Sequence, residues 1–107
     1  MRVVFEEAGG TVVGFLAASA EMVAALYVHV DYHGRGIGSA LLDLAKLESS
    51  GRLRLLTFQK NERAQRFYEA HGFSVIKRGF EKDWQLEDLE YEWVRVDGRP
   101  ELSRPQQ

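Results

Sequence analysis

Three glycines alternate at positions 34, 36 and 38, within the run His33-Gly34-Arg35-Gly36-Ile37-Gly38-Ser39. The run follows a long apolar stretch and precedes a segment with helical periodicity. The first turn of a helix leaves backbone N–H groups without partners inside the helix, and the helix dipole adds partial positive charge there. Glycines let a backbone approach an anion closely, and Arg35 adds a cation. The run therefore predicts a phosphate-binding turn.

Two better-known phosphate motifs do not fit this run. A P-loop needs a lysine directly after its last glycine, and no lysine follows Gly38. The dinucleotide fingerprint Gly-x-Gly-x-x-Gly needs two residues between its second and third glycines. Only one residue separates Gly36 from Gly38, so Ser39 or Ala40 would have to replace the third glycine. Taken alone, the run is also consistent with a tight strand-to-helix turn that binds nothing.

A second motif lies between Asn61 and Phe73. It fits the pattern Asn-x-x-Ala-x-x-Phe-Tyr-x-x-x-Gly-Phe, with matches at Asn61, Ala64, Phe67, Tyr68, Gly72 and Phe73. Together with the run from Val28 to Gly38, it resembles the GNAT superfamily of N-acetyltransferases. The family's cofactor motif, Arg/Gln-x-x-Gly-x-Gly/Ala, is matched at Gly36 and Gly38, whereas His33 replaces the arginine or glutamine and Val30 stands where proline is common. The resemblance covers about residues 3 to 96 and lacks the family's usual first strand and first two helices.

The resemblance implies a transferase that moves an acetyl group from acetyl-coenzyme A (acetyl-CoA) to a primary amine, by direct attack in a ternary complex. Tyr68 would protonate the departing thiolate as general acid, a role that suits a phenol with a pKa near ~10. The Val28 N–H would polarise the thioester carbonyl, and Asn61 would bind the pantetheine arm. The implied cofactor-binding residues are Val28, His29, Val30, His33, Gly34, Arg35, Gly36, Ile37, Gly38, Ser39 and Asn61.

Direct attack requires a neutral amine, so a general base must take up a proton. Glu21, at the head of the apolar stretch, is the predicted base, and His29 and His71 are alternatives. The chain has no cysteine, which excludes a thiolate metal site and a cysteine nucleophile, and no metal is predicted. The acidic residues from Glu81 to Glu92 form either a solvated hairpin or a surface that attracts a cationic acceptor.

Periodicity predicts the elements that position these residues. Val3 to Glu7 and Thr11 to Ala18 flank the turn Ala8-Gly9-Gly10 and predict a β-hairpin. Met22 to Val30 is almost unbroken apolar sequence, which predicts a central strand buried on both faces. The other expected elements are a helix from the glycine turn to about Glu48, a strand from Leu53 to Phe58, a helix with Asn61 as N-cap that stops at Gly72, and strands from Phe73 to Phe80 and Leu89 to Val96.

The order of these elements predicts an α/β (α+β) fold. It is a mixed, mostly antiparallel sheet with a central β-α-β unit and helices packed on it, as in GNAT-like acyl-CoA N-acyltransferases. In the first helix, the core-facing residues would be Ile37, Leu41, Leu44 and Ala45. Residues 1–97 would form the acetyltransferase domain, and residues 98–107 a polar, disordered tail.

The whole-chain properties limit the possible partners. A length of 107 residues suits one domain, and the net charge of −2 lacks the basic surplus of a nucleic-acid-binding protein. No apolar run approaches the ~20 residues of a membrane-spanning helix, and Met1 to Glu7 does not resemble a signal peptide. We expect a cytoplasmic protein whose partners are neither nucleic acids nor membranes. A homodimer is expected because the missing N-terminal elements leave a sheet edge open.

Three alternatives to acetyl transfer remain open at this point. A non-catalytic acyl-CoA-binding or sensing module would bind the cofactor without turnover. A structural domain would bind nothing. A transferase of this kind could also carry a larger acyl group, and its acceptor could be a small-molecule or a peptide amine.

Overall fold

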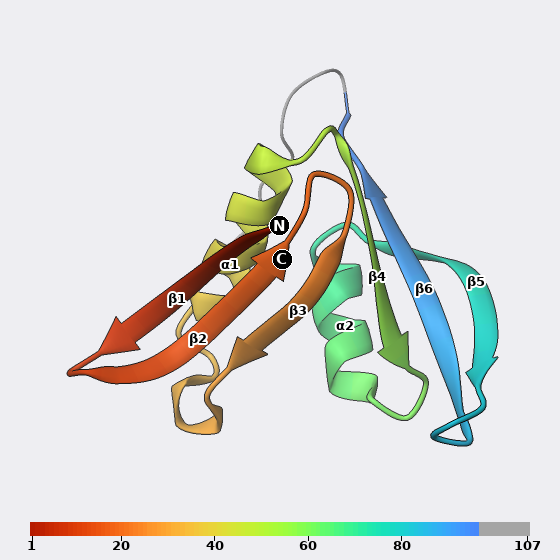
Figure 1. Cartoon of the computed structure of the whole chain (residues 1–107), viewed down its shortest axis with the longest axis horizontal. Helices are drawn as coiled ribbons and strands as arrows, with labels where there is room; N and C mark the ends of the chain where they lie inside the picture. Colours follow the sequence, from red (N-terminus) through yellow and green to blue (C-terminus); the bar gives the residue numbers. More distant parts are fainter. Residues whose placement is uncertain (97–107) are drawn as a thin grey trace.

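The computed structural model describes residues 1–96 and arranges them as two three-stranded sheets and two helices (Figure 1). The domain boundary predicted at residue 97 and the tail predicted for residues 98–107 lie outside the described residues. The elements in chain order are β1 (Arg2–Ala8), β2 (Thr11–Ala18), β3 (Val23–Val28), the 3-10 turn Val30–Tyr32, α1 (Ile37–Glu48), β4 (Arg52–Phe58), α2 (Glu62–Ala70), β5 (Ser74–Glu81) and β6 (Leu86–Val94).

The first sheet has the order β1-β2-β3 and is antiparallel throughout. Its first two strands form the predicted hairpin, and the turn between them places Gly9 and Gly10 at φ of +58° and +83°. Such positive φ values suit glycine because they bring a Cβ too close to the backbone in other residues. The hairpin predicted from the sequence is confirmed.

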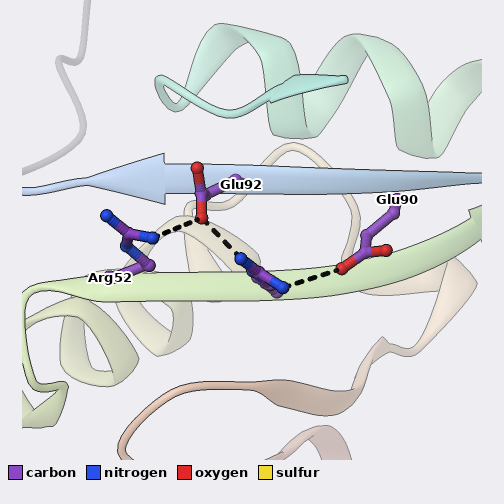
Figure 2. Close-up of polar contacts among 4 residues, drawn as sticks. Arg52, Glu90 and Glu92 are labelled. Carbon is purple, nitrogen blue, oxygen red and sulfur yellow. Dashed lines mark hydrogen bonds and ion pairs between the residues drawn. The ribbon is translucent and has the colours of Figure 1, made fainter. Parts of the chain in front are cut away.

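The second sheet has the order β4-β6-β5 and is also antiparallel. Strand β6 begins at Leu86, so the predicted connection from Glu81 to Asp88 is too long. On one face of this sheet Arg54 bridges Glu92 at 3.2 Å and Glu90 at 3.6 Å, and Arg52 lies 3.5 Å from Glu92 (Figure 2). These two arginines neutralise the charge of Glu90 and Glu92. Both glutamates belong to the acidic segment that the sequence offered as a surface for a cationic acceptor.

The two sheets meet at one point. Met22 forms an isolated parallel bridge with Arg54, whose N–H donates to the Glu21 carbonyl at 3.0 Å. Beyond this bridge β3 and β4 diverge, and α2 is seen between them (Figure 1). The central strand predicted from Met22 to Val30 is therefore wrong in two respects. Strand β3 ends at Val28, and it is only partly buried because β4 does not continue beside it.

The core lies between the sheets and α1. Trp93, Tyr91, Leu42 and Leu53 are each at most 1% exposed. Of the helix face predicted to be apolar, Leu41 and Ala45 are buried and Leu44 is only half-buried, while Leu42 takes a buried position that the pattern missed. Within the described residues, no helix has both the length and the apolar character needed to cross a bilayer.

Candidate active site

A cavity of about 510 Å³ lies between β3, the start of α1 and the first two turns of α2. Strand β3, the glycine turn and the first two turns of α2 all contribute to its wall. The lining residues are Leu26, Tyr27, Val28, Tyr32, His33, Gly34, Gly36, Ile37, Gly38, Ser39, Asn61, Arg63, Ala64, Phe67 and Tyr68. The two motifs found in the sequence thus line one cavity.

The glycine turn presents the start of α1 to this cavity. Gly34 and Gly36 have φ of +81° and +80°, and a Cβ built on either would meet nothing within 4 Å. The backbone conformation therefore requires glycine at both positions, and the space beside them is open. Gly36 is the N-cap of α1 without a side-chain hydrogen bond, and the first turn of the helix holds no acidic residue. The N–H groups of this turn are consequently available to an anion.

Gly38 is a glycine for a different reason. It is buried, and a Cβ there would lie 3.2 Å from the Phe67 ring and 3.4 Å from Val28 Cγ2. The absence of a side chain lets α1 pack closely against both α2 and β3. Gly38 and Phe67 both line the cavity, so this close contact forms part of its wall.

Helix α2 positions Asn61 and Tyr68. Asn61 is the predicted N-cap, since its Oδ1 accepts from the Ala64 N–H at 3.1 Å. Tyr68 lies two turns further along, half-buried, with its ring edge-on to Phe67 at 5.3 Å and to Phe73 at 5.8 Å between centroids. Burial raises the pKa of the Tyr68 phenol above its usual value. The phenol is therefore protonated at neutral pH and can donate a proton into the cavity.

The edge of β3 that faces the cavity offers backbone hydrogen-bonding groups. The His29 N–H donates to the Val13 carbonyl on β2 at 2.8 Å. Because alternate residues of a strand point their backbone groups to opposite sides, those of Leu26 and Val28 point away from β2, toward the gap. The Val28 carbonyl already accepts from His33 Nε2 at 2.9 Å. The Val28 N–H and the backbone of Leu26 face the gap as possible partners for a bound ligand.

Some predicted residues lie beside the cavity rather than in its wall. Arg35 stacks over the Tyr32 ring at 4.8 Å. His29 accepts from the Asp31 N–H at 3.1 Å, and Val30 is 69% exposed in the 3-10 turn. Glu21 is exposed at the head of β3, at the point where the two sheets join, and does not line the cavity.

His71, an alternative base in the sequence, is directed toward the glycine turn. Its Nε2 lies 2.8 Å from Ser39 Oγ, and its Nδ1 lies 2.7 Å from the Phe67 carbonyl. Both ring nitrogens are thus engaged in hydrogen bonds. Ser39 and His71 form a pair that the sequence did not indicate, because 32 residues separate them.

Sequence reasoning also missed several lining residues. Leu26 could have been found from strand alternation, because it lies two residues before Val28 on the same face. Arg63 adds a cation from the first turn of α2, and Tyr32 comes from the 3-10 turn, which no periodicity predicted. Among residues 1–96, no group of three or more histidine, aspartate or glutamate side chains could hold a metal ion.

Comparison with known proteins gives consistent matches. The sequence profile of the family described as Acetyltransferase (GNAT) domain matches residues 2–75. The peptidyl-lysine N-acetyltransferase YiaC of Escherichia coli (strain K12) is 31% identical over 91 residues, which are 84% of this chain and 62% of YiaC.

Solved structures share the fold. Nourseothricin acetyltransferase superposes with a TM-score of 0.75 at 22% identity, over 81% of this chain and 60% of that one. A Bacillus anthracis str. Ames protein assigned as a streptothricin acetyltransferase, solved in complex with acetyl coenzyme A, gives 0.79 at 17% identity, over 88% of this chain and 63% of that one. The chain thus spans about three-fifths of the length of these relatives.

Proposed function

The chain belongs to the GNAT acetyltransferase family, and on this premise we propose that it transfers an acetyl group from acetyl-CoA to a primary amine by direct attack in a ternary complex. One observation carries the proposal. The uncapped start of α1, the open edge of β3 and the half-buried phenol of Tyr68 all meet in a single cavity of about 510 Å³. Each of these parts suits a different portion of the same cofactor.

The glycine turn fits the pyrophosphate of the cofactor. The N–H groups from Gly36 to Ser39 would donate to the phosphate oxygens, in space that a side chain at Gly34 or Gly36 would enter. Arg63 lines the cavity and Arg35 lies over the ring of Tyr32, which also lines it, so both can place a cation beside the cofactor. The remaining residues assigned to the cofactor are Val28, His29, Val30, His33 and Asn61.

The open edge of β3 fits the pantetheine arm, which carries amide groups and would pair with the strand like an added strand. The Val28 N–H would also polarise the thioester carbonyl, as an oxyanion-hole donor does. Asn61 uses its Oδ1 to cap α2. Its Nδ2 would donate to a carbonyl of the arm.

Tyr68 is the proposed general acid. The bound thioester supplies the acetyl group, and the departing thiolate needs a proton. The phenol is protonated at neutral pH, as a general acid must be, and burial, which raises its pKa, keeps the proton on it until the thiolate develops. Its position on the cavity wall gives it access to the reacting end of the cofactor.

Glu21 is the proposed general base. It is exposed at the closed end of the gap between β3 and β4, where an acceptor could approach from outside. It would take up the proton of the amine through water, because it does not line the cavity itself. His71 suits this role less well, since both of its ring nitrogens are engaged.

The proposed acceptor is a small-molecule or peptide amine, and a peptidyl lysine is the first to test. This choice follows from the 31% identity with YiaC, which is named a peptidyl-lysine N-acetyltransferase. The homodimer, the cytoplasmic location and the absence of nucleic-acid or membrane partners are parts of the same proposal and rest on the sequence.

The test is an acceptor screen with acetyl-CoA. The purified chain is incubated with acetyl-CoA and lysine peptides or small polyamines, released thiol is followed, and the acetylated product is identified by mass spectrometry. The proposal predicts amine-dependent thiol release. Saturable cofactor binding with no turnover on any amine would contradict it and favour a sensing module.

A further inference from the structure

Ser39 and His71 join the glycine turn to the far end of α2. Ser39 is the third residue of α1 and lines the cavity, and its Oγ lies 2.8 Å from His71 Nε2. His71 follows α2 as its C-cap, and its ring packs against the Phe67 ring at 4.4 Å between centroids, tilted by 39°. The ring is therefore held from two sides while it contacts a side chain of the proposed phosphate site.

The hydrogen bonds of His71 fix where the protons lie. The Phe67 carbonyl can only accept, so the Nδ1 that lies 2.7 Å from it carries a hydrogen. In the neutral ring Nε2 is then an acceptor, and the Ser39 hydroxyl must donate to it. A serine hydroxyl has one hydrogen. Neutral His71 thus leaves Ser39 with only oxygen lone pairs to present to the cavity, and these repel a phosphate.

Protonation of His71 reverses this bond. Nε2 then donates to Ser39 Oγ, and the serine hydrogen is free to turn into the cavity. A phosphate oxygen can accept it, in a charge-assisted hydrogen bond.

We infer that His71 is a positioning residue that sets the direction of the Ser39 hydroxyl, so that binding of the coenzyme A pyrophosphate is coupled to protonation of His71. The inference rests on the proposed function, which places the pyrophosphate at this turn. Its direction follows from the bonds. Affinity for coenzyme A is higher while His71 is protonated and falls as the pH rises and the ring loses its proton.

Other charged and titratable groups face His71 from each neighbouring element. From α1, the Lys46 ammonium donates to the His71 backbone carbonyl at 2.6 Å. From α2 and β6, the Glu69 carboxylate accepts from the Tyr91 hydroxyl at 2.8 Å, and Tyr68 lies on the same helix. His33, in the turn that precedes α1, also lines the cavity. All of these, and the ligand's own phosphates, are common to the wild type and the variants, so their contributions cancel in a comparison.

The test measures the dissociation constant of coenzyme A by calorimetry at about pH 6 and about pH 8. It compares the wild type with Ser39→Ala and His71→Gln. The glutamine amide can donate to Ser39 Oγ at every pH, and the alanine has no hydroxyl to direct. The quantity compared is the dissociation constant at the higher pH divided by that at the lower pH. We expect this ratio to be about tenfold larger for the wild type than for either variant, which is the scale of a hydrogen bond to a charged group. His71→Gln should bind more tightly than the wild type at the higher pH.

Each other outcome overturns the inference in a recognisable way. If Ser39→Ala keeps the wild-type ratio, the imidazolium acts through its charge and not through the hydroxyl. If His71→Gln keeps it, another group titrates. If the wild type binds coenzyme A and its dissociation constant changes with pH as much as that of both variants, there is no coupling to His71. The proposed function is not affected by that result. If the wild type binds no coenzyme A at either pH, both the inference and the proposed function fail.

Discussion

The two helices of this chain begin in opposite ways. Helix α2 is capped by the Asn61 side chain and carries Glu62 in its first turn, so its end is satisfied by its own residues. Helix α1 begins at Gly36 in a left-handed conformation, with no side-chain cap and no acid in its first turn. Both ends border the same cavity. The difference indicates that α1 leaves its N–H groups for a ligand, whereas α2 uses its own for stability.

The two ends also differ in what holds them in place. Gly38, near the start of α1, touches Phe67 of α2, so the open end is supported through the neighbouring helix. Helix α2 is also tied to β6 by the bond from the Tyr91 hydroxyl to Glu69. We therefore expect changes at α1 to affect binding first, and changes at α2 to affect turnover or stability.

The largest effect is expected from Gly36→Glu, which adds bulk and negative charge where the pyrophosphate would bind. It should abolish measurable acetyl-CoA binding in calorimetry. The matched control is Gly10→Glu, because Gly10 has a φ of +83° and equally open space but lies in the β1–β2 turn. The control should bind normally. Equal binding by both variants would remove the start of α1 from the cofactor site.

Tyr68→Phe should keep cofactor binding and lower kcat by ~10²-fold, the usual scale for a lost general acid. Tyr91→Phe is the matched control, since it removes a phenol that bonds Glu69 and does not line the cavity. Its kcat should equal that of the wild type under conditions where both are folded. An unchanged rate in Tyr68→Phe would take the acid role away from this residue.

Tyr91 should make the fold sensitive to alkali. Burial, together with the hydrogen bond and charge of Glu69, raises the pKa of Tyr91 to about 12. The folded chain therefore holds this proton to higher pH than the unfolded chain does. This contribution to stability is complete below about pH 10 and is lost as the pH rises toward about 12, by about 2 kcal/mol.

Denaturant midpoints at mildly and strongly alkaline pH would measure this loss. Tyr91→Phe cannot ionise, so its stability should decline less steeply with pH than that of the wild type. Tyr27→Phe is the control because Tyr27 is 49% exposed, and it should follow the wild type. Parallel pH profiles for wild type and Tyr91→Phe would contradict the assignment.

The smallest effect is expected at the cap of α2. Asn61→Ala should lower the free energy of unfolding by about 1 kcal/mol, the typical value of an N-cap. Asn61→Asp keeps the capping oxygen and should retain stability, while it loses the amide hydrogens proposed to bind the pantetheine arm. Chemical denaturation and cofactor titration on both variants separate these roles. Equal destabilisation by both would show that the cap bond is not what stabilises the helix.

The sequence predicted most of the elements because their signals are local. Gly9 and Gly10 predicted the first hairpin, and Asn61 and Gly72 predicted both limits of α2. The predictions failed at β3, where an apolar run was read as a strand buried on both faces. An apolar run does not show whether a neighbouring strand continues beside it. Here β4 pairs with this run only at the bridge between Met22 and Arg54, and the two strands then diverge.

The candidate site was predicted only where its residues belong to a local sequence motif. Residues with a motif of their own, such as Gly36 and Tyr68, line the cavity. The Ser39–His71 pair depends on how α1 packs against α2, and no local pattern specifies that contact. His33 is a further case, because its bond to the Val28 carbonyl follows from the bend of the 3-10 turn between them.

The most direct test of the contrast between the two helix starts is an NMR titration of the ¹⁵N-labelled chain with acetyl-CoA. If α1 binds the pyrophosphate, the largest saturable amide shifts should fall on Ile37, Gly38 and Ser39, with a smaller change at Ala64, whose N–H is already bonded to Asn61. Saturation with the largest shifts elsewhere, or no saturable shift at the start of α1, would contradict the account.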